Sequence, residues 1–196
     1  MSYLKTIYLV RHAQPLLNTG INYKVVPGPG LTEAGREQAR EAGQFLLNCG
    51  IERLYASPLE RARQTAQGIA AATGLPITLE PLLREFDDPA ESKANLLARL
   101  AQFLQNIQQI GVSSVALVSH GSPVREVLTM LSEGSLDFKP YETSHGNPVT
   151  PAGIWQATRR TDAWFLELVF QPKAGDWDRF KSPVQIKPRQ TSFEIA

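Results

Sequence analysis

Two short runs of apolar and β-branched residues constrain the fold more than any other feature of the sequence. They are Thr6–Val10 and Ser114–Ser119, and neither alternates strictly between apolar and polar residues. A strand that is buried on both faces has this composition, and such strands are typical of parallel sheets covered by helices. Both runs are therefore predicted to be central strands of one parallel sheet.

The rest of the chain predicts helices and short strands in alternation. Helices are expected from Thr32 to about Asn48, from Ser57-Pro58 to about Ala72, over Glu91–Ile110 and over Pro123–Leu131. Further strands are expected at Arg53–Ala56 and Pro76–Leu79, and a hairpin at Gly153–Arg160 and Trp164–Phe170. Ser57 is expected to cap its helix, with Pro58 in the first helical position. This order predicts an α/β fold, a three-layer α/β/α sandwich around a mostly parallel sheet that could carry an antiparallel edge.

We expect a single domain over residues 1–171, followed by an extended tail over residues 172–196. A chain of 196 residues favours one domain over two. The formal net charge is +1 and the cations are scattered among the acids, which argues against a nucleic-acid partner. The single cysteine, Cys49, and the short apolar stretch at the N-terminus predict a cytoplasmic protein without membrane association.

Cationic and imidazole side chains fall at comparable places in this predicted fold. Arg11 and His12 follow the first buried run, and His120 follows the second. Arg61 lies near the start of an expected helix, whose N-terminus favours anions. If the strands are neighbours, these groups would repel one another unless an anion lies between them. The pattern predicts a phosphate-binding pocket, because Arg groups bind oxyanions in pairs of hydrogen bonds.

The strings around these residues resemble the histidine phosphatase superfamily. Val10–Gln14 is similar to the Arg-His-Gly signature of the family, and Ser57–Ala66 is very similar to its second signature. Leu31–Gly35, Leu83–Glu85 and Ser119–Gly121 resemble three further family segments, in the family's order. The resemblance extends from residue 7 to about residue 131 and implies a phosphoglycerate mutase-like fold.

The resemblance also implies roles for individual residues. His12 would be the nucleophile and would carry the phosphoryl group as phosphohistidine. Arg11, Arg61 and His120 would bind the phosphoryl oxygens and take part in catalysis, and no metal or cofactor is implied. Asn18 and Gly121 would complete the phosphate-binding set. Glu85 would serve as general acid and base.

The sequence departs from the family pattern at two places. Ala13 stands where the family usually has glycine, so the turn after His12 must accommodate a Cβ. Residues 86–119 are few compared with many relatives, which predicts a reduced lid and a more exposed Glu85. Asp87 or Asp88 could then be the acid instead. An open site favours hydrolysis over a mutase reaction, which needs a pocket that excludes water.

We therefore expect a phosphomonoester hydrolase that acts on a small-molecule phosphoester or a phosphoprotein. Two alternatives stay open: a cofactor-dependent phosphoglycerate mutase-type phosphotransferase, and a module of the same fold that binds a phosphate ligand without turnover. His145 lies in an expected loop and is given no role. The sequence carries no signal for the oligomeric state.

Overall fold

A single mixed sheet of six strands forms the middle of the molecule. The computed structural model describes residues 3–143, 146–161 and 163–173. The strand order is β3-β2-β4-β1-β5-β6. The strands are β1 (Thr6–Arg11), β2 (Arg53–Ala56), β3 (Ile77–Leu79), β4 (Ser114–Ser119), β5 (Ile154–Arg160) and β6 (Ala163–Phe170).

The two predicted central strands are neighbours and run in the same direction. β1 pairs with β4 in parallel, with Val10 opposite Val118 and Arg11 opposite Ser119. β2 and β3 continue the parallel part of the sheet, whereas β5 and β6 add an antiparallel edge. The mostly parallel sheet is therefore confirmed. The register also brings the residues that follow β1 and β4 to the same edge of the sheet.

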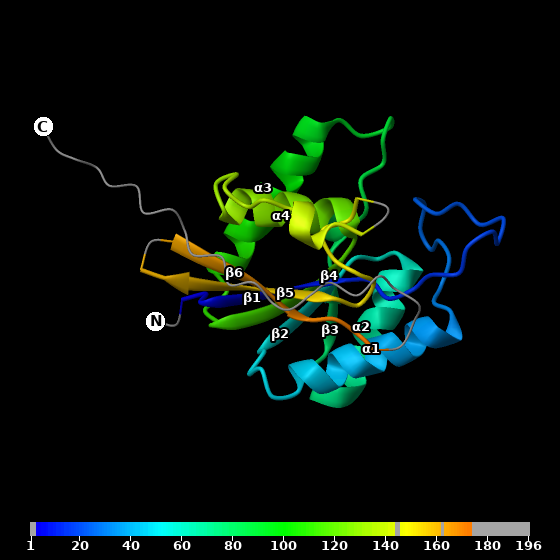
Figure 1. Cartoon of the computed structure of the whole chain (residues 1–196), viewed down its shortest axis with the longest axis horizontal. Helices are drawn as coiled ribbons and strands as arrows, with labels where there is room; N and C mark the ends of the chain where they lie inside the picture. Colours follow the sequence, from blue (N-terminus) through cyan, green and yellow to red (C-terminus); the bar gives the residue numbers. More distant parts are fainter. Residues whose placement is uncertain (1–2, 144–145, 162, 174–196) are drawn as a thin grey trace, which may run out of the picture.

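Helices cover both faces of the sheet (Figure 1). Helices α1 (Glu33–Leu46) and α2 (Glu60–Thr73) pack on one face, and α3 (Lys93–Gln108) and α4 (Gly121–Leu131) pack on the other. Two short 3-10 turns, η1 (Pro81–Leu83) and η2 (Lys139–Tyr141), lie in the connections. Two clusters of buried apolar side chains fill the layers above and below the sheet. The three-layer α/β/α sandwich is confirmed.

The start of α2 differs from the prediction. The helix begins at Glu60, with Leu59 at its N-cap and no side-chain cap, so Ser57 and Pro58 lie before it. The backbone N–H of Glu60 donates instead to the carbonyl oxygen of Pro27 at 2.6 Å. The Ser57 hydroxyl is hydrogen-bonded to the ring of His120 at 2.7 Å. Ser57 is thus used by the site rather than by the helix.

Two other helices also begin at residues that differ from the predicted ones. α3 begins at Lys93 because Ser92 caps it by accepting a hydrogen bond from the backbone N–H of Asn95, and the predicted first residue Glu91 lies outside it. α4 begins at Gly121, directly after His120, and not at Pro123. His120 therefore stands at the N-cap of a helix.

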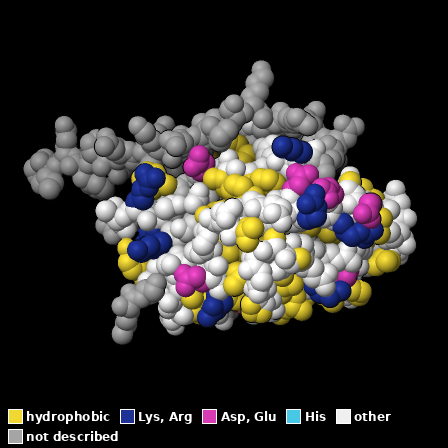
Figure 2. All heavy atoms as spheres, turned by 90° about the horizontal axis from the view of Figure 1, so that it is seen from below, with side chains coloured by type: hydrophobic (Ala, Val, Ile, Leu, Met, Phe, Trp, Pro, Cys, Tyr) yellow, Lys and Arg dark blue, Asp and Glu magenta, His cyan; other side chains and the backbone are white. Residues whose placement is uncertain are grey.

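On the face covered by α1 and α2, the described residues form no large region of one charge. Figure 2 shows lysine and arginine side chains interspersed there with acidic ones and with apolar side chains. No helix among the described residues is long and apolar enough to cross a membrane. Most of the predicted tail, from residue 174, lies outside the described residues, as does His145.

Candidate functional site

His12 and His120 lie side by side at the carboxyl edge of the sheet. The backbone N–H of His12 donates to the carbonyl oxygen of Ser119 at 2.8 Å, which continues the pairing of β1 with β4 beyond the strand. The two ring centroids are 5.1 Å apart. Both side chains are buried, with 1% of His12 and none of His120 exposed. The predicted convergence of these residues is therefore present in the structure.

A backbone hydrogen bond fixes which ring nitrogen of His12 is available. Nδ1 lies 2.8 Å from the carbonyl oxygen of Ala13, which can only accept, so Nδ1 must carry the proton. The lone pair is then on Nε2. The hydroxyl of Tyr23 lies 3.3 Å from that nitrogen and donates to it. His12 thus presents a nucleophilic nitrogen in one defined orientation.

The guanidinium groups of Arg11 and Arg61 lie close enough to His12 for their charges to act on it, and part of their donors are unused. Nη1 of Arg11 donates to the carbonyl oxygen of Val149 at 2.9 Å, and Nη1 of Arg61 donates to that of Tyr23 at 2.7 Å. Nε of both arginines and Nη2 of Arg61 are buried and have no partner. Neither arginine forms an ion pair with a described residue.

One ring nitrogen of His120 is hydrogen-bonded within the protein, and the other has no partner. Its Nε2 lies 2.7 Å from the hydroxyl of Ser57, while its Nδ1 is buried without a partner. If the Ser57 hydroxyl donates to Nε2, the proton of the neutral ring is on Nδ1. The ring then offers a further unused donor.

Burial and charge repulsion make these groups electrostatically costly. Burial, followed by the charges of Arg61 and Arg11, holds the pKa of His12 well below its usual value of 6.5. Burial also lowers the pKa of His120, and His12 and Arg61 add to the effect. Desolvation likewise lowers the pKa of both arginines. An anion bound among these groups would relieve both costs.

The three candidate acids differ in their surroundings. Glu85 is partly buried, its Oε1 accepts from the backbone N–H of Phe86 at 2.9 Å, and its charge acts on both Arg11 and Arg61. Asp87 lies 3.6 Å from the ammonium of Lys24. The side chain of Asp88 is exposed, and its carbonyl oxygen accepts from Lys24 at 2.7 Å. Of these three carboxylates, only the charge of Glu85 affects the pKa values of Arg11 and Arg61.

The remaining predicted residues are placed less closely. Asn18 is exposed, has a left-handed φ of 57° and forms no hydrogen bond with the described residues of the cluster. Gly121 leaves no room for a side chain, because a Cβ would lie 1.7 Å from Oδ1 of Asn147. Ala13 keeps its Cβ without left-handed strain, and its N–H donates to the Thr65 hydroxyl at 2.9 Å.

Two residues of the site have no recognised role in the sequence pattern. Tyr23 lies in a loop rich in glycine, proline and asparagine, where a single aromatic residue indicates nothing specific. Ser57 reads as a helix cap, so its contact with His120 is hidden. Among the described residues, no group of three or more His, Cys, Asp or Glu is arranged to hold a metal ion.

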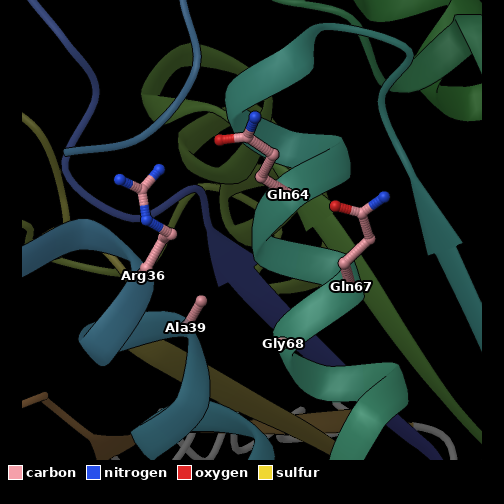
Figure 3. A pocket seen from close by; sticks show the side chains of 5 residues that line it. All are labelled: Arg36, Ala39, Gln64, Gln67 and Gly68. Carbon is pink, nitrogen blue, oxygen red and sulfur yellow. The ribbon is translucent and has the colours of Figure 1, made fainter. Parts of the chain in front are cut away.

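A surface hollow elsewhere in the molecule is unrelated to this cluster. It has a volume of about 320 Å³ and opens between α1 and α2, lined by Arg36, Ala39, Gln64, Gln67 and Gly68. Figure 3 shows the side chains of Arg36, from α1, and Gln64 and Gln67, from α2, around this space. Arg36 is already paired with Glu33 on its own helix. The hollow contains no nucleophile or acid and shares no residue with the histidine cluster.

Comparison with known proteins gives a family match over the first part of the chain. Residues 7–88 match the family model described as histidine phosphatase superfamily (branch 1). Over 81 residues the chain is 41% identical to a probable phosphoglycerate mutase of Erwinia tasmaniensis, which covers 41% of this chain and 38% of that relative. The chain thus aligns with well under half the length of the curated relative. His120 lies beyond the residues that match the family model.

Solved structures resemble the chain over most of its length. A phosphoglycerate mutase from Bacillus anthracis matches with a TM-score of 0.67 at 19% identity, covering 86% of this chain and 93% of that one. A mycobacterial glucosyl-3-phosphoglycerate phosphatase matches with a TM-score of 0.63 at 21% identity, covering 83% and 96%. At such identities the likeness shows the fold alone, which is the phosphoglycerate mutase-like α/β fold.

Proposed function

Because residues 7–88 match the histidine phosphatase superfamily, we propose that this chain is a phosphomonoester hydrolase of that superfamily and that it forms a phosphohistidine on His12. Its substrate would be a small-molecule phosphoester or a phosphoprotein. The similar proteins named above include both a phosphatase and mutases. The proposal therefore adds that the phosphoryl group is transferred to water and not to a second organic molecule.

The observation that carries the proposal is the set of unused donors around a nucleophilic nitrogen. Arg11, Arg61 and His120 together leave four buried nitrogen atoms without a partner, and the ring of His12, with its lone pair on Nε2, has its centroid 5.1 Å from that of His120. Buried donors without partners are rare in proteins because each costs about 1–3 kcal/mol. A tetrahedral dianion would satisfy several of them at once and would neutralise the arginines.

The proposed reaction has two steps. The Nε2 lone pair of His12 attacks phosphorus as the bond to the ester oxygen breaks, and Glu85, in its protonated form, gives its proton to that oxygen. Water then attacks the phosphohistidine and passes a proton back to Glu85, while the electron pair of the N–P bond returns to Nε2. Arg11, Arg61 and His120 stabilise the charge on the phosphoryl oxygens in both steps.

Phosphoryl transfer to a second organic acceptor is the rival function. The names of the relatives favour it, since the curated match is a probable phosphoglycerate mutase. Hydrolysis is supported by the short segment between Glu85 and His120, in which α3 and β4 are the only regular elements. Such a segment supplies little cover to exclude water from a phosphohistidine.

The decisive experiment compares the wild type with His12→Ala on a panel of phosphoesters. The panel contains sugar phosphates, nucleotides, phosphoglycerates and a histidine-phosphorylated protein, with bisphosphoglycerate primer in a parallel set. We expect release of inorganic phosphate by the wild type only, and acid-labile label on the peptide that carries His12. Equal, near-zero rates for both proteins would reject the enzyme, and primer-dependent isomerisation without phosphate release would identify a mutase.

A second prediction concerns the proton donor. Glu85→Gln should slow hydrolysis of an alkyl phosphate by about 10²–10⁴-fold, because the leaving alkoxide needs a proton. Hydrolysis of p-nitrophenyl phosphate should fall much less, since nitrophenolate leaves without one. Asp87→Asn is the matched control, as Asp87 is paired with Lys24. If Asp87→Asn gives the selective loss instead, Asp87 is the acid.

A further inference from the structure

Tyr23 contacts the site in three ways that the proposed mechanism does not use. Its hydroxyl lies 3.3 Å from Nε2 of His12. Its ring lies against the guanidinium of Arg61, with 3.8 Å between the guanidinium carbon and the ring centroid. Its carbonyl oxygen accepts from Nη1 of the same arginine at 2.7 Å. One residue thus engages both the nucleophile and a phosphate-binding group.

We propose that Tyr23 is a cap on the nucleophile, whose side chain must leave before a phosphoryl group can reach His12. The inference rests on the proposed function in one respect, the use of Nε2 as the attacking atom. In-line attack requires phosphorus about 3–3.5 Å from Nε2 along the lone pair. The Tyr23 hydroxyl already lies at that distance, so both cannot be there together.

The Tyr23 hydroxyl is suited to donating a hydrogen bond to the lone pair of His12 because it keeps its proton. Burial raises the pKa of Tyr23, and the charges of Arg61 and Arg11 oppose that change only in part. The neutral hydroxyl therefore donates to Nε2, whose own ring proton is held on Nδ1 by the carbonyl oxygen of Ala13. A phosphoryl group must break this hydrogen bond and the contact of the ring with Arg61.

The loop around Tyr23 is built to move as a local unit. Ile21, Val25 and Val26 are more than half exposed, so little apolar surface holds this segment down. The loop, dark blue in Figure 1, projects from the end of the sheet beyond the helical layers. Gly28, with a φ of +67°, lets it turn back close to Arg61, where a Cβ would lie 3.3 Å from Nη1.

A polar contact ties the cap to the segment that carries the candidate acid. The ammonium of Lys24, next to Tyr23, donates to the carbonyl oxygen of Asp88 at 2.7 Å and lies 3.6 Å from the carboxylate of Asp87. These groups are exposed, so the contact is weak and reversible. Displacing Tyr23 would therefore release both loops that border the site.

The first test is direct binding of inorganic phosphate by calorimetry, which needs no turnover. Tyr23→Phe removes the competing hydrogen bond and should tighten binding about two- to tenfold. Tyr23→Ala also removes the contact with Arg61 and should tighten it further. Tyr3→Phe is the matched control, because Tyr3 is 59% exposed and lies before β1. Weaker binding by Tyr23→Phe would overturn the proposal and make the hydroxyl a phosphate ligand.

The second test measures the access to Nε2 of His12 without any phosphate. Diethyl pyrocarbonate modifies neutral imidazoles, and peptide mapping separates His12 from His120. We expect faster modification of His12 in Tyr23→Ala than in the wild type, with His120 as the internal reference. Equal rates would overturn the proposal. If the wild type proves inactive on every phosphoester while both tests succeed, the cap stands and the proposed hydrolase fails.

Discussion

At the level of single residues, the site consists of titratable and charged groups whose burial is energetically unfavourable. His12 and His120 are buried beside two arginines, and the pKa of each histidine is depressed well below 6.5. The depressed pKa keeps His12 neutral at physiological pH, which is what a nucleophilic nitrogen requires. The same surroundings that keep His12 neutral should therefore cost folding free energy.

The pH dependence of stability should reveal this cost. Below the unfolded value of 6.5 the unfolded chain binds protons that the folded histidines do not, so the free energy of unfolding falls as the pH falls through 6.5. Each histidine contributes up to about 1.4 kcal/mol per pH unit. Urea unfolding at several pH values between about 7.5 and about 5.5 measures the change in the free energy of unfolding per pH unit.

The matched variants are His12→Asn and His120→Asn. Each should remove about half of the histidine-dependent slope, because each deletes one group that the folded state keeps unprotonated. A slope that is the same in both variants and in the wild type would mean that the two rings take up protons as readily in the folded protein as in the unfolded one.

Among the elements, the segment between η1 and α3 contains no helix or strand, yet it has a strong anchor. Arg99 of α3 forms a double hydrogen bond with Glu91, at 2.7 and 3.0 Å, and also donates to the carbonyl oxygens of Leu82 and Glu85. Arg99 and Glu91 are each 7% exposed. The Ser119 hydroxyl holds Leu83 from the other side, at 2.7 Å. Glu85 is thus positioned from α3 and from β4.

Arg99→Met should destabilise the fold and loosen Glu85. Removing one partner of a buried ion pair leaves the other charge unpaired, which costs about 3–5 kcal/mol. Arg84 still reaches Glu91 at 3.1 Å, so the lower end is expected. Urea unfolding gives the stability, and hydrolysis of an alkyl phosphate reports on Glu85.

The double variant Arg99→Met/Glu91→Leu separates charge from position. It should recover most of the stability, since no unpaired charge stays buried, but not the activity, since the carbonyl oxygens of Leu82 and Glu85 remain unheld. Full recovery of activity would show that Arg99 does not position Glu85.

At this scale the sequence predicts the existence of elements better than their ends. Periodicity and apolar runs locate the strands and helices. Ser57-Pro58, in contrast, has the composition of a helix start, yet the helix begins at Glu60 because tertiary partners take the polar groups. A capping preference of about 1 kcal/mol is easily outweighed by such contacts.

For the whole molecule, most of what could be predicted from the sequence came from the two buried strands, β1 and β4. Their parallel pairing fixes the sheet, and with it the neighbourhood of His12 and His120. Arg61 was predictable because it lies near the start of the helix that follows β2. Tyr23 was not, since a loop between residues 13 and 32 has no periodicity, and its return to the site depends on contacts with residues distant in sequence.

Phosphate should stabilise the entire fold through this site. At one hundred times its Kd, a ligand that binds only the folded state adds about 2.7 kcal/mol. For a chain of this length that corresponds to a rise in Tm of about 5–10 °C. Differential scanning calorimetry with and without inorganic phosphate measures it.

Two arginines on α2 provide the comparison. Arg61→Met should abolish the rise in Tm, because its unpartnered donors are lost. Arg63→Met should keep it, as that side chain is paired with Glu60 at 2.7 Å. A rise that survives Arg61→Met would place phosphate at another site.

The position of β1 within the sheet bears on how the protein is made. β1, which ends at Arg11 just before His12, is synthesised before its two neighbours, β4 and β5, which come from residues 114–119 and 154–160. The side chain and backbone of Arg11 are held by Val149 and Gly153. A nascent chain still short of β5 has His12 but not all of the surroundings that orient it. The pocket around His12 can therefore form only after the chain has been synthesised as far as β5.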